Sequence, residues 1–391
     1  MTQQERRPRA RTWRSWLVLA VVAAVVAVVA VGLATRAPER ERSAPDPVAP
    51  SSTPPSPEVP VVPSLLRDQS QPEWDPAGAS LPFHDVGLDE SVISGAAGAP
   101  FTGLSHAVLA TVSDGAVHLQ GPDTSWQSRP VPGPPLRRFG GNLDLFPEGT
   151  RVVYLGARKI WSFDVRGGPW RSMDYPEPPA GPRGNRALDV QLVPQDAEDA
   201  VLRSHQKVWR LDLDTQRAER MVWTDPTDEL VPAEPEPWVL ADGLLGGASR
   251  QYLQPTGPGA VGVTALGHLT RAAARPDGRL AAVRSALVSE EADDAEDRDG
   301  IVVVDPAQAR ATAFLPLPTQ GSPWANSGRV RVLGWLGSQV LLRADLGVAG
   351  LSGLERSTLL VRWDPETGEL SRVGSVGNAD AVAVAVDTLT P

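Results

Sequence analysis

Short apolar runs bounded by Gly, Pro or Asp recur from about residue 105 to the end of the chain. Within them, hydrophobic residues alternate with polar ones or follow one another for four or five positions, which predicts β-strands rather than helices. Six runs stand at comparable places, and four of them end in Asp: Val117–Gly121, Ile160–Asp164, Val208–Asp212, Gln251–Pro255, Ile301–Asp305 and Leu360–Asp364. Their last residues lie 43 to 59 positions apart.

A further strand is predicted before several of these runs, directly after a tight turn. Pro147–Gly149 precedes Arg151–Leu155, and Pro276–Gly278 precedes Arg279–Val283. Gly supplies a positive φ and Pro presets φ, while an Asp at the end of a run favours a turn by bonding to its own backbone. A period of 40–50 residues made of short strands is typical of β-propeller blades. The pattern therefore predicts an all-β domain of six blades, with a seventh built from residues 74–104 as an alternative.

The first and last strands of this domain suggest how a ring would close. The first unit shows only three strands, Val108–Val112, Ala116–Gln120 and Trp126–Val131, whereas a blade needs four. The chain ends with the alternating run Ala379–Val386, which is separate from the last unit. We expect this C-terminal strand to complete the first blade and to leave few strand edges exposed.

Two segments resemble known propeller families. Leu360–Leu370, LVRWDPETGEL, is similar to the third strand, turn and fourth strand of a WD40 blade. Leu269–Val283, LTRAAARPDGRLAAV, resembles the Pro-Asp-Gly blade of TolB-type propellers. The resemblance covers about residues 105–377 and implies an architecture, not a function. The tryptophans within or beside the strands are expected to pack between blades, with stacking on carbohydrate or peptide as the alternative: Trp126, Trp161, Trp209, Trp335 and Trp363.

The N-terminal part has a different pattern. Trp16–Ala34 is a run of nineteen residues without a charge, about 28 Å long as a helix, which suits the hydrocarbon core of a bilayer. Five Arg precede it, and the positive-inside rule keeps that end in the cytoplasm. We expect a retained single-pass anchor in the cell membrane with the bulk of the chain outside. Secretion after cleavage of a signal peptide is the alternative.

A proline-rich segment follows the apolar run. Pro38–Pro63 holds nine prolines in 26 residues, which predicts an extended stalk without helix or sheet. The expected organisation has four parts: a cytoplasmic Arg-rich tail (1–15), a transmembrane helix (16–35), a disordered stalk (36–73) and an extracytoplasmic propeller (74–391).

Charge and composition exclude some kinds of partner and some kinds of chemistry. Residues 1–42 carry a net charge of +5, so the remainder carries −15 of the total of −10. An acidic body is repelled by phosphate backbones, and we expect no nucleic-acid binding. The chain has no Cys, which excludes disulfides, thiol catalysis and Cys zinc sites. Its basic residues are Arg apart from Lys159 and Lys207, a bias typical of bacterial proteins from GC-rich genomes.

Candidate chemistry is sparse. No nucleophile elbow, HExxH or phosphate-binding loop occurs, and the five His are far apart in sequence: His84, His106, His118, His205 and His268. Gly257–Gly262 matches G-x-G-x-x-G, but it is expected between strands and not before a helix. The acidic run Glu290–Asp299 lacks the first and last carboxylates of an EF-hand loop and is expected to be a solvated loop, with another kind of calcium site as the alternative. We assign no catalytic, cofactor-binding or metal-binding residue, predict no cofactor, and expect no enzymatic activity.

Loop placement gives the one indication of function. The acidic run joins the second and third strands of the fifth unit, and Ala344–Arg356 joins the same strands of the sixth. They would share a face with the long connections between blades, Pro176–Gly184, Pro226–Pro237 and Pro318–Gly328. Because loops on a rigid scaffold commonly carry function, we expect a protein or peptide partner on this face. The alternatives are a lyase, lactonase or glycosidase with carboxylates or His at the axial channel, and an extracytoplasmic small-molecule or ion sensor.

Overall fold

A computed structural model of the chain divides into residues 1–57 and 58–391, and every residue that it describes belongs to the second unit. The described residues are 69–391 with these gaps: 77–79, 94–97, 136–141, 178–189, 197, 205–206, 224–228, 232–237, 246–247, 256–261, 265–267, 286–298, 306–309, 319–329, 347–356 and 378. The predicted tail, membrane helix and most of the predicted stalk lie outside them. No helix within the described ranges has the length and apolar character needed to span a membrane.

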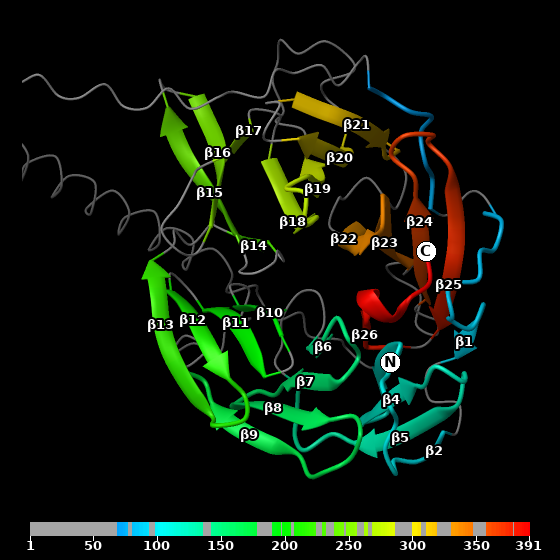
Figure 1. The fold of residues 1–391 in the computed structure, drawn as a ribbon, viewed down its shortest axis with the longest axis vertical. Coiled ribbons are helices and arrows are strands. Elements are labelled where there is room, and N and C mark those ends of the chain that lie inside the picture. Colours follow the sequence, from blue (N-terminus) through cyan, green and yellow to red (C-terminus); the bar gives the residue numbers. More distant parts are fainter. Residues whose placement is uncertain are drawn as a thin grey trace, which may run out of the picture. The chain divides into compact units, whose positions relative to one another are not determined.

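The described strands pair into six sheets arranged around a common axis (Figure 1). Each is written here from its innermost strand outward. The first is β26 (Ala381–Val384), β3 (Leu109–Ser113), β4 (Ala116–Gln120), β5 (Trp126–Pro130) and β2 (Ala99–Pro100). The second is β6 (Leu143–Leu145), β7 (Arg151–Leu155), β8 (Lys159–Asp164) and β9 (Arg171–Asp174). The third is β10 (Val190–Pro194), β11 (Asp199–Ser204), β12 (Lys207–Asp212) and β13 (Arg217–Trp223).

The other three sheets continue around the axis in chain order. The fourth is β14 (Glu229–Val231), β15 (Trp238–Leu245), β16 (Ala248–Pro255) and β17 (Gly262–Thr264). The fifth is β18 (His268–Ala274), β19 (Leu280–Ser285), β20 (Gly300–Asp305) and β21 (Arg310–Pro316). The sixth is β22 (Val330–Leu336), β23 (Gln339–Leu346), β24 (Ser357–Trp363), β25 (Leu370–Gly377) and β1 (Val92–Ile93). A 3-10 helix, η2 (Val386–Thr388), follows β26.

This chain is a β-propeller. The second and third strands of a sheet are covered by the neighbouring sheets on both faces, which explains why their sequences are continuous apolar runs. Every residue of β7 and of β20 is buried. The outer strand β5 is half-buried along most of its length and reads as a mixed polar sequence.

The C-terminal strand closes the ring as predicted. Strand β26 pairs antiparallel with β3, and its end residues Ala381 and Val384 lie opposite Val112 and Leu109. It supplies the innermost strand of the first sheet, whose other three principal strands come from the start of the domain. The C-terminal strand is therefore joined to the first sheet by a hydrogen-bonded ladder, and this sheet has no open inner edge at β3.

The segment before the first sheet has a role that the sequence pattern did not predict. We call residues 69–100 the belt, because its described parts run along the outer strands of three sheets (Figure 1). Ser70 pairs with Phe314 of β21, Phe83 pairs with Arg372 of β25, and β1 and β2 extend the sixth and first sheets in parallel. The seventh blade suggested for residues 74–104 is therefore wrong. Two strands of two residues each cannot form a blade, and the belt instead covers outer edges that would be exposed.

Packing between neighbouring sheets forms the core. Trp363 is fully buried in a cluster shared by the fifth and sixth sheets, and Trp335 packs against the same cluster. Trp161 packs against the cluster between the first and second sheets, and Trp209 against the one between the second and third. Trp126 joins the cluster of the sixth and first sheets. The prediction that these five tryptophans pack between blades is confirmed.

The Asp residues that end several strands form turns, also as predicted. Oδ1 of Asp164 accepts a 2.8 Å hydrogen bond from the backbone N–H of Arg166. Asp212 and Asp364 each accept two such bonds from the backbone of the next three residues. Asp212 also accepts a hydrogen bond from the hydroxyl of Thr215. That bond is the largest cause that holds the pKa of Asp212 below its ordinary value, and the backbone bonds add to it. A carboxylate that caps its own turn is committed to structure.

Candidate binding face and axial cavity

The two faces of the ring differ in the length of their connections. Five connections of ten to fifteen residues all begin and end at one face: 131–142, 175–189, 286–299, 317–329 and 347–356. We call this the long-connection face. From β3 to β26, no connection at the opposite face, the short-connection face, exceeds six residues. The eight residues 101–108 before β3 also lie at this face, where the N–H of Ala107 bonds to the carbonyl of Gly149. In an antiparallel four-stranded sheet, the second-to-third turn and the link to the next sheet share one face, which explains why these five connections meet.

The strand bounds test the predicted loop positions. Glu290–Asp299 does lie between β19 and β20, and most of Ala344–Arg356 lies between β23 and β24, the second and third strands of their sheets. Apart from its last residue, the acidic run falls outside the described residues, as do 347–356. The grouping of Pro226–Pro237 with these connections is wrong. Glu229–Val231 is the inner strand β14, so 232–237 belongs to the short-connection face; a three-residue strand amid prolines gives little periodicity to detect.

The described part of the long-connection face is firmly anchored. The hydroxyl of Tyr154 donates a 3.0 Å hydrogen bond to the carbonyl of Gly133, and Tyr175 donates one of 3.0 Å to the carbonyl of Gly156. Pro135 also pairs with Gly156 as an antiparallel bridge. Burial raises the pKa of the Tyr154 phenol, so it stays a neutral donor. These bonds fix the base of two long connections onto the second sheet.

An axial cavity of about 370 Å³ lies among the inner strands. Its walls are largely aliphatic and come from β6, β10, β18, β22 and β26. Among the described residues of its lining, Asp144 is the one carboxylate and there is no His. The remaining charged side chains are four arginines from the third, fifth and sixth sheets: Arg203, Arg271, Arg331 and Arg343.

Two of these arginines connect neighbouring sheets. Nη1 of Arg271 donates a 2.9 Å hydrogen bond to the carbonyl of Val330 in the next inner strand. Nη1 of Arg343, a buried residue, donates a 2.7 Å bond to the carbonyl of Val382, while its Nε bonds to Asp345 at 2.8 Å. Each inner strand has one edge whose backbone groups lack a partner in a neighbouring strand, and these side chains bond to some of those groups.

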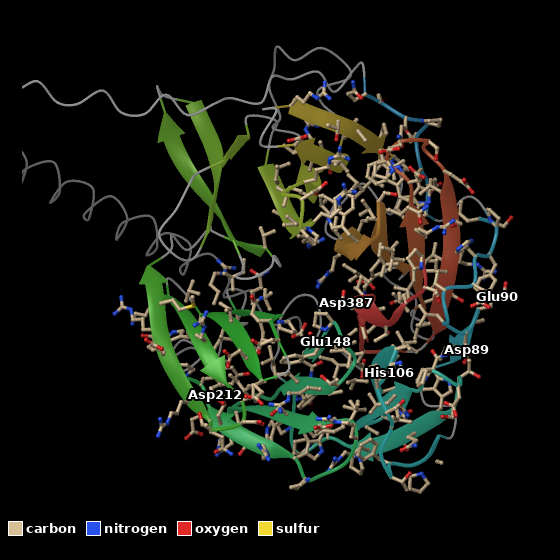
Figure 2. The ribbon with its side chains drawn as sticks, viewed as in Figure 1. Asp89, Glu90, His106, Glu148, Asp212 and Asp387 are labelled. Carbon is tan, nitrogen blue, oxygen red and sulfur yellow. The ribbon has the colours of Figure 1, made fainter. Side chains whose placement is uncertain are left out.

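A second cavity, of about 500 Å³, lies around the axis at the short-connection face. Pro147, Pro194 and Trp335 are among its lining residues, and η2 contributes Val386 and Asp387. Figure 2 places Asp387 near the axis beside Glu148, whereas Asp212 lies farther out on its sheet and Asp89 and Glu90 lie at the rim. The backbone N–H of Asp387 bonds to the carbonyl of Pro147, and burial raises the pKa of its carboxyl.

The histidines named in the sequence analysis do not come together at the axis in the part of the chain that the structure describes. Nε2 of His118 lies 3.0 Å from the hydroxyl of Ser113 within the first sheet, and Nε2 of His84 lies 2.7 Å from Arg362 in the belt region. His106 contacts Ser105 at the surface. The side chains of His205 and His268 are outside the described set. Across the residues that the structure describes, no three His, Asp or Glu side chains are grouped closely enough to hold a metal ion.

The G-x-G-x-x-G match stands between two strands. Gly257–Gly262 connects β16 to β17, and its last residue begins β17. A dinucleotide fingerprint needs a strand before it and a helix after it. The interpretation of this match as a coincidence of letters is consistent with the strand order.

The arginines of the axial cavity were missed in the sequence. Each occupies one position inside an apolar strand, as in Leu202-Arg203-Ser204 or Val330-Arg331-Val332. A single charged residue within such a strand is a signal of a special role, because buried charges need partners and are otherwise avoided. The sequence does not show that strands far apart in the chain bring these positions to one axis.

Comparisons with known proteins add a resemblance of fold. No protein-family profile matches the chain, and no curated protein sequence is detectably similar to it. Among solved structures, the tricorn protease matches with 15% identity and a TM-score of 0.39, over 71% of this chain and 30% of that one. TolB from Acinetobacter baumannii matches with 13% identity and a TM-score of 0.39, over 70% of this chain and 66% of that one.

A putative TolB from Agrobacterium tumefaciens matches with 10% identity and a TM-score of 0.42, over 71% of this chain and 92% of that one. The chain thus spans less than a third of the tricorn protease and just under two thirds of the Acinetobacter TolB. With TM-scores below 0.5, these resemblances carry no functional conclusion. The propeller assignment rests on the strand pairing given above.

Proposed function

We propose that this chain is a membrane-anchored, extracytoplasmic propeller of six blades that binds a protein or peptide partner through its long-connection face and catalyses no reaction. The observation that carries the proposal is the grouping of all five longest connections at one face of a closed ring. Loops held on a rigid scaffold can vary in sequence without loss of the fold, and binding residues concentrate there. From β3 to β26, the short-connection face offers turns of at most six residues.

The ring suits this role because it presents a fixed base. Its ends are joined by the β26–β3 ladder, and its outer edges on three sheets are covered by the belt. Tyr154 and Tyr175 tie two long connections to the second sheet. Because this scaffold is already ordered, little of its conformational entropy is lost when a partner binds.

The membrane part of the proposal is supported by the sequence alone. Trp16–Ala34 has the length and apolarity of a membrane span, and the arginines before it favour a cytoplasmic N-terminus. Pro38–Pro63 would then hold the propeller away from the membrane surface. The composition of the chain favours a bacterial cell membrane as its location.

The test is a cross-linking pull-down of the full-length protein from its own membranes, with mass spectrometry of the captured proteins. In one variant, residues 286–298 and 347–356 are replaced by short Gly-Ser linkers. In a matched control, residues 232–237 of the short-connection face are replaced in the same way. We expect one reproducible partner that is lost in the first variant and kept in the control. A partner that survives the first replacement and is lost in the control would refute the assignment of the face.

A further inference from the structure

The second cavity, at the short-connection face, has largely apolar walls that folding leaves partly exposed. Its volume of about 500 Å³ is within the usual range for small-ligand sites. Apolar side chains from four sheets and from η2 line it, and these six are half-buried: Pro147, Pro194, Ala274, Leu333, Trp335 and Val386. Apolar surface gathered in a concave and accessible place is a common mark of a ligand site.

Three charged residues line this cavity in the described part of the chain, and two of them are paired with each other. Nη2 of Arg275 bonds to Oδ2 of Asp277, and the same guanidinium lies 5.3 Å from the centre of the Trp335 ring. The bond to Arg275 is also the largest cause of the lowered pKa of Asp277. The third charged residue of the lining is Asp387, and neither member of this pair contacts it through a bond that the structure shows.

The carboxylate of Asp387 has no hydrogen bond and no ion pair within the part of the chain that the structure describes. The bond to the carbonyl of Pro147 uses only its backbone N–H. Desolvation raises the pKa of this carboxyl, and it is the one cause of the shift, so no described cation opposes it. A carboxylate that has lost part of its water without gaining a partner is stabilised by a cation that binds beside it.

We propose that the second cavity is a binding site for a small organic cation, an amine with an apolar body. The apolar body would cover the half-buried side chains of the walls, and the ammonium group would donate a charged hydrogen bond to the carboxylate of Asp387. A neutral apolar ligand fits less well, because it would remove Asp387 further from water without supplying a partner. A metal ion also fits less well, since no three His, Asp or Glu side chains are grouped to hold one in the described ranges. The site lies at the face opposite the proposed partner-binding face and does not depend on it.

Cavity shape and charge therefore point to the same ligand class. The walls provide apolar contact on several sides, and Asp387 provides the single charge that a ligand can neutralise. An amine that satisfies only one of the two requirements should bind weakly.

The experiment is a calorimetric titration of the full chain in a mild detergent at neutral pH, with protein-free micelles of the same detergent as the blank. The probes are tryptamine, which is an aromatic amine, and tryptophol, in which a hydroxyl group replaces the amino group. Ethylamine carries the charge without the apolar body. We expect saturable binding of tryptamine, with tryptophol and ethylamine each weaker by about tenfold or more. Absence of saturable tryptamine binding, or equal affinity for tryptamine and either of the other probes, would overturn the proposal.

Variants of Asp387 then locate the bound amine. Asp387→Asn keeps the shape of the side chain and removes its charge, so it should weaken tryptamine binding about tenfold and leave the binding of tryptophol unchanged. Asp387→Glu keeps a carboxylate and should bind tryptamine more tightly than Asp387→Asn does. Asp114→Asn, at an exposed turn of the long-connection face, should bind tryptamine as the original chain does. Thermal midpoints without ligand identify any variant that is simply destabilised. Unchanged tryptamine affinity in a folded Asp387→Asn variant would contradict the proposal.

Discussion

The side chain of Gln71 accepts a 2.7 Å hydrogen bond on Oε1 from the indole N–H of Trp363, a residue 292 positions later in the chain. Its Nε2 donates a 2.8 Å bond to the carbonyl of Pro365 in the turn that follows. The start of the belt is therefore bonded to a fully buried tryptophan of the sixth sheet. This contact makes the belt part of the folded domain and not an extension of the stalk.

Truncation of the belt's buried aromatic residue should destabilise the domain strongly. Trp74 is 3% exposed within the cluster between the fifth and sixth sheets, and Trp74→Ala is expected to lower the free energy of unfolding by about 3–5 kcal/mol. Phe83→Ala is a matched control, since Phe83 lies in the same segment but is 38% exposed. Urea unfolding of both variants measures the difference. Equal losses would show that the belt is not part of the core.

Removal of the C-terminal strand should unfold the ring. A chain ending at residue 377 lacks β26, so β3 loses its ladder and Arg343 loses the carbonyl of Val382. We expect the cooperative thermal transition to disappear. Deletion of Pro391 alone, which is exposed, should leave the transition intact. A truncated chain that melts like the original would mean that closure does not stabilise the domain.

Two turn glycines separate backbone strain from steric clash. Gly149 and Gly115 both have positive φ, 70° and 74°. A Cβ on Gly149 would lie 2.1 Å from the carbonyl oxygen of Ala107, whereas one on Gly115 would meet nothing within 4 Å. Gly115→Ala should therefore cost about 1 kcal/mol of unfolding free energy, and Gly149→Ala clearly more. The difference is measured by chemical denaturation, and similar losses would argue against this contact.

The raised pKa of Asp387, whose carboxyl is partly desolvated beside the second cavity, predicts a pH dependence of stability. Burial raises its pKa, so the folded chain binds a proton at pH values where the unfolded chain has lost it. The free energy of unfolding should therefore fall as pH rises from the ordinary Asp pKa through the raised value, and stay lower above it. Asp387→Asn should be more stable than the original chain at pH 7 and similar to it near pH 3. Asp114→Asn, at an exposed turn, controls for the loss of one negative charge. A stability gain equal in both variants would contradict this account.

Much of the fold could be predicted because propeller strands have local signals. The apolar runs, the turn glycines and the Asp residues after the third strands gave the strand order of most sheets and the role of β26. The belt gave no such signal. Its pairing with β21 and β25 joins residues more than two hundred positions apart, and its contact segments are too short to show periodicity.

The candidate site was predictable in one respect and not in another. Loop lengths follow from strand order, so the long-connection face could be located from the sequence. The axial arginines could not, because Arg203 and Arg331 come to line one cavity through the arrangement of the sheets around the axis and not through any local pattern. The positive φ of Arg271, 52°, likewise depends on a β-bulge that the sequence of β18 does not specify.

Site-specific photo-cross-linking tests the central claim most directly. A photoreactive amino acid is placed at exposed turn positions of the full chain in its own membranes: Asp114 and Arg158 on the long-connection face, and Thr215 and Thr367 on the short-connection face. The account predicts a common cross-linked partner from Asp114 and Arg158 and none from Thr215 and Thr367. A partner captured only from the two threonine positions would contradict it.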